Sequence, residues 1–140
     1  MPELMDRLLP KVISPRTHAV IDCIQAGANF AAGALFRRRS PRASNAAFWL
    51  GASILANALM TDYPLGVFRG YSFRVHGALD YGVAAASEAI PRLLGIEDTP
   101  EARYFKLQGT SEWLIAGLTD YNDTTGSRRR DRLFPHRRAA

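Results

Sequence analysis

The chain has 140 residues, of which 47% are hydrophobic and 22% are charged, and this mix excludes disordered and collagen-like proteins. Its length fits one domain, and its single cysteine, Cys23, excludes an internal disulfide. The net charge of +5 is carried by residues 127–140, which hold six Arg and one Asp, so the remainder is neutral overall. We therefore expect no nucleic-acid binding by the folded body.

The first helix is predicted to begin at Ser14-Pro15, because a hydroxyl N-cap followed by proline is a common helix start. From there the sequence continues without a breaker until residues 37–42 (RRRSPR), which indicate a turn. Ser44 or Asn45 can cap a second helix, which is expected to stop before Pro64.

Ser72 is expected to cap a third helix that runs to about Leu94. Gly95 and the polar run IEDTPEA at 96–102 indicate the next turn, and the last helix is expected to end near Asp120. Signals for strands are absent, because there is no sustained alternation of polar and apolar residues.

The two halves of the chain match when the sequence is shifted by 58 positions without a gap. Residues 14–23 (SPRTHAVIDC) and 72–81 (SFRVHGALDY) then share the pattern S-x-R-x-H-x-x-x-D. The same shift pairs Thr61-Asp62-Tyr63 with Thr119-Asp120-Tyr121. We interpret the chain as two copies of one helical hairpin. The predicted order is an N-terminal segment, two repeats and a basic tail, at residues 1–13, 14–63, 72–121 and 126–140.

Two related hairpins predict an all-α fold, an antiparallel four-helix bundle with pseudo-two-fold symmetry. The helices are long enough to span a bilayer, for which roughly 20 residues suffice. Their hydropathy is weaker than their length, and Glu88, Arg92, Lys106 and Glu112 would be costly against lipid. These features alone favour a soluble cytoplasmic bundle.

Two sequence elements, at the end of the first repeat and in the second repeat, carry a resemblance that points to a membrane instead. A first element, T-[DN]-Y-x-x-G, is matched by Thr61, Asp62, Tyr63 and Gly66. A second element, a basic residue, H-x-x-x-D and a helix end with proline, is matched by Arg74, His76, Asp80 and Pro91. In this order they resemble the small bacterial membrane proteins with SPW-type repeats, although Ile90-Pro91-Arg92 stands in place of Ser-Pro-Trp. The resemblance implies four transmembrane helices and no established activity.

The distribution of basic residues indicates an orientation. The N-terminal end through Arg16, the 64–74 loop and the basic tail hold 11 of the 18 Lys and Arg, which suits both termini in the cytoplasm. We expect a protein of the inner (cytoplasmic) membrane whose partners are the lipid bilayer and other membrane protein subunits. The basic tail is expected to contact anionic lipid.

Catalytic motifs such as a phosphate-binding loop or a nucleophile elbow are absent from the sequence. We therefore expect a structural or accessory subunit rather than an enzyme.

The repeated polar residues are predicted to meet at one end of the bundle. His18 and Asp22 are four residues apart and share one helix face, as do His76 and Asp80. In antiparallel hairpins the ends of the second and fourth helices lie at the same level. The predicted polar cluster comprises Arg16, His18, Asp22, Asp62, Tyr63, Arg74, His76, Asp80, Asp120 and Tyr121.

Three interpretations of this cluster remain open. In the structural one, Arg16 and Arg74 bridge the helix-end carboxylates Asp62 and Asp120, and each histidine donates to an aspartate. In the metal interpretation, a divalent Zn, Mn or Fe ion is bound by ligands from His18, Asp22, Asp62, His76, Asp80 and Asp120. In the third, His18 and His76 are the axial ligands of a b-type haem.

Overall fold

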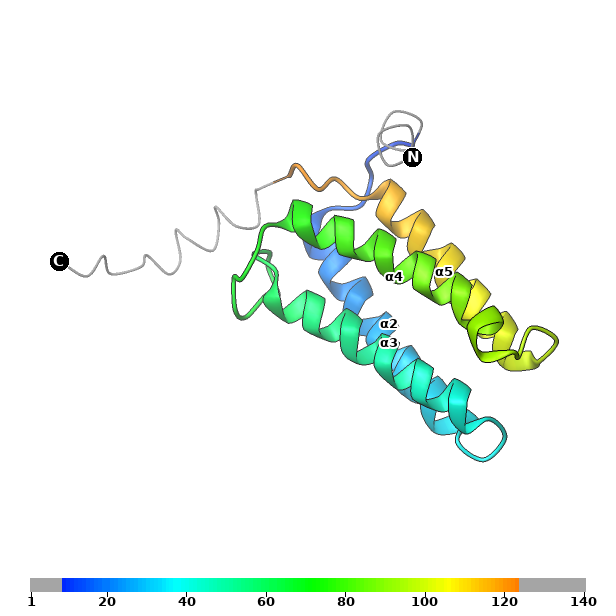
Figure 1. Ribbon diagram of the computed structural model, residues 1–140. Coiled ribbons are helices and arrows are strands. Elements are labelled where there is room, and N and C mark those ends of the chain that lie inside the picture. Colours follow the sequence, from blue (N-terminus) through cyan, green and yellow to red (C-terminus); the bar gives the residue numbers. More distant parts are fainter. Residues whose placement is uncertain (1–8, 124–140) are drawn as a thin grey trace.

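The computed structural model describes residues 9–123, which form four helices and no extended strand. The helices are α2 (Pro15–Phe36), α3 (Pro41–Met60), α4 (Phe73–Leu94) and α5 (Pro100–Leu118) (Figure 1). The predicted all-α class with four helices is confirmed. The basic tail, and the N-terminal segment up to residue 8, lie outside the described residues.

Three of the helices begin in the same way, with a hydroxyl N-cap followed by proline. The side chains of Ser14, Ser40 and Thr99 each accept a hydrogen bond from the backbone N–H three residues further on. The predicted start of the second helix at Ser44 or Asn45 is therefore wrong. Proline needs no N–H partner in the first helical turn, so Pro41 begins α3 rather than interrupting the chain.

The helices pack chiefly in two pairs, α2 with α3 and α4 with α5 (Figure 1). In each pair the backbones come close at a glycine. A Cβ atom on Gly51 would lie 3.1 Å from the carbonyl oxygen of Ala26, and one on Gly109 would lie 2.9 Å from that of Ala84. These two contacts are related by the shift of 58 positions.

The segments before α2 and α4 connect the two repeats. Ile13 donates its N–H to Leu118 O (3.0 Å) and accepts from Asp120 N (3.1 Å). Tyr71 likewise donates to Met60 O (3.3 Å) and accepts from Asp62 N (2.9 Å). The start of each repeat is thus hydrogen-bonded to the end of the other repeat, again at equivalent positions of the sequence.

The interior is small and polar, whereas many large apolar side chains lie outside. Among residues 9–123, nine of the fourteen buried hydrophobic residues are alanine, and fourteen polar or charged residues are buried with them. Trp49 is 75% exposed, Leu35 77% and Ile24 65%. Water-soluble proteins usually bury large aliphatic groups and expose polar ones. Within the described residues one helix, α2, is long and apolar enough to cross a membrane.

Substitution of the buried glycine should test the packing of α4 against α5. Gly109→Ala places a methyl group against the backbone of Ala84, and we expect it to lower the free energy of unfolding by about 1–3 kcal/mol. Gly82→Ala is the matched control, since a Cβ there meets nothing within 4 Å. It should be neutral or stabilising by up to about 1 kcal/mol. Equal stability of the two variants in thermal unfolding would contradict this packing.

Candidate functional site

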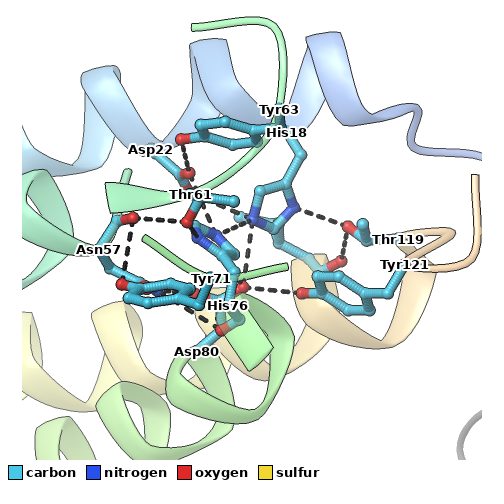
Figure 2. Close-up of polar contacts among 11 residues, drawn as sticks. His18, Asp22, Asn57, Thr61, Tyr63, Tyr71, His76, Asp80, Thr119 and Tyr121 are labelled. Carbon is cyan, nitrogen blue, oxygen red and sulfur yellow. Dashed lines mark hydrogen bonds and ion pairs between the residues drawn. The ribbon is translucent and has the colours of Figure 1, made fainter. Parts of the chain in front are cut away.

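Two histidines meet at the centre of the site (Figure 2). His18 lies in the first turn of α2 and His76 in the first turn of α4, and both side chains are fully buried. Their Nε2 atoms are 3.0 Å apart. Both histidines are the fourth residue of their helix, although only Ser14 caps its helix through its side chain, and Ser72 makes no side-chain capping hydrogen bond.

A threonine fixes the orientation of each ring. His18 Nδ1 lies 2.8 Å from Thr119 Oγ1, and His76 Nδ1 lies 2.7 Å from Thr61 Oγ1. Each hydroxyl donates its own hydrogen to a backbone carbonyl one turn back, Ile115 O or Asn57 O. Each threonine oxygen therefore accepts from Nδ1–H, and in the neutral rings both Nε2 atoms present a lone pair.

Two carboxylates flank the facing nitrogens. Asp22 lies 3.3 Å from the Nε2 atoms of both His18 and His76, through Oδ1 and Oδ2 respectively. Asp80 Oδ2 lies 3.2 Å from both of these nitrogens. The four side chains are almost fully buried, and we refer to His18, Asp22, His76 and Asp80 as the His–Asp centre.

Two tyrosines just beyond the helix ends hold the carboxylates. Tyr63 donates its hydroxyl to Asp22 Oδ2 (2.7 Å), and Tyr121 donates to Asp80 Oδ2 (2.8 Å). Burial, together with the charge of the adjacent aspartate, raises the pKa of both phenols well above the ordinary value. Both hydroxyls therefore stay protonated and act as donors.

The surroundings of the two carboxylates differ in one respect. Asn57 donates to Asp80 Oδ1 (2.9 Å), and the hydroxyl of Tyr71 donates to Asn57 Oδ1 (2.6 Å). At the equivalent positions of the other repeat the sequence has Ile115 and Ile13. Asp80 consequently has a polar support that Asp22 lacks.

Of the ten residues predicted to cluster, the structure brings six together. These are His18, Asp22, Tyr63, His76, Asp80 and Tyr121. The others lie outside: Asp62 pairs with Arg69 (3.4 Å), Asp120 accepts from the backbone N–H of Asn122, Arg74 donates to Asn122, and Arg16 is exposed. The expected Arg16–Asp62 and Arg74–Asp120 bridges are replaced by these contacts.

The backbone explains why Asp62 lies apart from the His–Asp centre. Residues 61–63 follow α3 as an irregular segment paired with Tyr71, in which neighbouring side chains point in different directions. Thr61 and Tyr63 are 0% and 1% exposed, whereas Asp62 is only partly buried. Thr61 and Thr119 contact the histidine rings but are missing from the predicted cluster, although both belong to the repeated Thr-Asp-Tyr triplet.

A haem between the histidines does not fit this geometry. The two Nε2 atoms are in direct contact at 3.0 Å, so no porphyrin plane can lie between them. A metal ion does fit the donor set. His18, His76 and Asp80 each offer one ligand atom, and these atoms lie within 4.8 Å of one another.

A cavity of about 270 Å³ lies next to the centre. Tyr63, Phe73 and Tyr121 line it, and the rings of all three also contact a histidine of the centre. One layer of aromatic side chains therefore separates the His–Asp centre from this cavity.

Comparison with known proteins gave no match: neither a family model, nor a curated protein, nor a solved structure is significantly similar to this chain. The resemblance to SPW-type repeat proteins stays a prediction.

Removal of the Thr119 hydroxyl should show how much its hydrogen bond to His18 contributes to the free energy of unfolding. Thr119→Val leaves His18 Nδ1 without its acceptor, and we expect the free energy of unfolding to fall by about 1–3 kcal/mol. Thr110→Val, which removes an exposed hydroxyl bonded to Glu88, should change it by no more than about 0.5 kcal/mol. Chemical unfolding of both variants measures the difference, and equal effects would contradict the assigned hydrogen bond.

Proposed function

We propose that this protein binds one divalent transition-metal ion at the His–Asp centre. The observation that carries the proposal is the convergence of two histidine Nε2 atoms whose Nδ1 atoms are engaged by Thr61 and Thr119. Two lone pairs that face each other at 3.0 Å repel unless a cation or a proton lies between them.

Two protons or one dication would balance the charges of the centre, and the facing nitrogens favour the dication. Asp22 and Asp80 are buried, and buried carboxylates need a compensating positive charge. One shared proton would leave a net negative charge. Two protons would direct two N–H groups at each other across 3.0 Å. A divalent ion accepts both lone pairs and neutralises both carboxylates.

The distances are compatible with first-row metals. The two Nε2 atoms and Asp80 Oδ2 form a triangle with sides of 3.0, 3.2 and 3.2 Å. An ion about 2.1 Å from each corner would lie about 1 Å out of the plane of this triangle. Asp22 is then the nearest further ligand, and imidazole with carboxylate suits Zn, Mn or Fe.

The remaining contacts resemble those that support known metal ligands. Metal-bound histidines usually donate their second N–H to an oxygen, and bound carboxylates are usually hydrogen-bonded in turn. Here Thr61 and Thr119 accept the second N–H of the two histidines. Tyr63 and Tyr121 donate hydrogen bonds to the two carboxylates.

Metal analysis of the purified protein tests the proposal. We expect about one equivalent of a transition metal per chain, and a metal affinity at least about tenfold lower in Asp80→Asn because a charged ligand is lost. Asp62→Asn is the matched control, since Asp62 pairs with Arg69 and should keep the metal. A native protein that contains no metal and takes up no Zn, Mn or Fe would refute metal binding.

A second candidate function is structural, as expected for an accessory subunit. It is favoured by the hydrogen bonds of the His–Asp centre, which reach α2, α4 and the segments that follow α3 and α5. In that case chelators should leave the melting temperature unchanged, whereas Asp80→Asn should lower it.

We further propose that the four helices form an antiparallel bundle of two hairpins related by an internal two-fold axis and embedded in a membrane, with both termini cytoplasmic. The outward large apolar side chains and the polar interior support this placement. The exposed charges Glu88, Arg92, Arg103 and Lys106 gather near the 95–99 connection between α4 and α5. That end then lies at the headgroups, where long charged side chains reach water.

Cysteine labelling tests the membrane placement. Cys23 lies exposed within α2 and should be shielded by lipid, so a membrane-impermeant maleimide should leave it unlabelled until detergent is added. In a Cys23→Ser background, Asp98→Cys in the connection should be labelled once that side of the membrane is accessible. Recovery of the whole protein in the soluble fraction after lysis would overturn the placement.

A further inference from the structure

A second buried polar group lies deeper in the bundle than the His–Asp centre. Gln25 and Asn29 lie on α2 and Gln108 and Glu112 on α5, all between 0% and 8% exposed. We call these four residues the Glu112 layer. Gln25 lies within hydrogen-bonding reach of the Glu112 carboxyl group, so the two helices meet there.

Each residue of the Glu112 layer has a polar atom without a hydrogen-bond partner. Three of these atoms are oxygen acceptors, Gln25 Oε1, Asn29 Oδ1 and Glu112 Oε2, and the fourth is the donor Gln108 Nε2. Asn29 is held in place because its Nδ2 donates to the backbone oxygen of Gln25 (2.9 Å). Buried polar atoms are rarely left unpaired, so a ligand or proton is expected here.

The fold does not require polar residues at these positions. The shift of 58 positions relates Gln25 and Asn29 to Val83 and Ser87 on α4, and it relates Gln108 and Glu112 to Leu50 and Ile54 on α3. Ser87 satisfies its hydroxyl on its own helix, by donating to Val83 O (2.8 Å). The contact of α2 with α5 therefore has two glutamines, an asparagine and a glutamate where the equivalent contact of α4 with α3 has mostly aliphatic side chains.

We propose that the Glu112 layer is a second cation site, selective for a small monovalent cation such as Na⁺. Carboxylate and amide oxygens are the ligands that hard cations prefer, and three unpaired oxygens are available. A half-turn of the Gln108 amide would supply a fourth. When it is deprotonated, Glu112 contributes one negative charge, and no cationic side chain of the described chain pairs with it, so one monovalent ion would neutralise the layer.

Thermal unfolding in different salts tests this site. The detergent-solubilised protein is heated in NaCl, KCl, LiCl or choline chloride at equal ionic strength, at several pH values. We expect the melting temperature to rise with Na⁺ concentration and not with choline. Trp113 lies next to Glu112 in sequence, so in a Trp49→Phe background its fluorescence should report Na⁺ binding directly.

Substitutions of three carboxylates distinguish cation binding at Glu112 from effects elsewhere in the protein. Glu112→Gln should abolish the dependence on Na⁺, whereas Glu88→Gln, the same change at an exposed position of α4, should keep it. Asp80→Asn should also keep it, so the outcome does not depend on metal binding at the His–Asp centre. If Glu112→Gln fails to fold, the melting temperatures in the different salts are compared between the unmodified chain and Asn29→Leu.

Two results would overturn the proposal. Equal melting temperatures in NaCl and choline chloride at every pH would show that no alkali cation is bound. A melting temperature that depends on pH but not on Na⁺, with this dependence lost in Glu112→Gln, would assign a proton to Glu112 instead of a cation.

Discussion

The direct approach of His18 and His76 is the interaction on which the rest of the structure depends. Their Nε2 atoms face each other at 3.0 Å because Thr119 and Thr61 each engage the Nδ1 atom of one ring. These threonines are in turn placed by the crossed backbone pairing of Ile13 and Tyr71 with the ends of the opposite repeats. Helix starts, helix ends and ring orientation are thus coupled through one buried point.

Much of the arrangement of the His–Asp centre could be predicted from the sequence, because the residues shared by the two repeats are mostly polar. The i, i+4 spacing of His and Asp predicted that each pair shares a helix face, and the repeat predicted that the two pairs are equivalent. Side-chain direction beyond a helix end could not be read in this way. The chain leaves helical geometry at Thr61 and Thr119, so helical periodicity no longer says which of three successive residues faces inward.

The charged residues of the sequence also failed to predict which side chains contact the aspartates of the His–Asp centre. Arg16 and Arg74 seemed the natural partners for buried carboxylates, yet they are exposed, and uncharged hydroxyls and an amide hold Asp22 and Asp80. The start of α3 shows a related difficulty, since the same Ser-Pro dipeptide was taken as a helix start at Ser14 and as a turn at Ser40. Local chemistry is identical at the two places, and only the neighbouring sequence differed.

The crossed pairing of the two repeats has a consequence for how such a chain can arise. Each repeat contributes one histidine, one aspartate, one threonine and one tyrosine, and each is closed by the backbone of the other. A half-length ancestor would have had to assemble as a symmetric homodimer to complete the centre, with both subunits identical at every position. Joining the two halves into one polypeptide frees them to diverge. Asn57 beside Asp80, and Glu112 on one side of the interior alone, are differences that a symmetric homodimer could not contain.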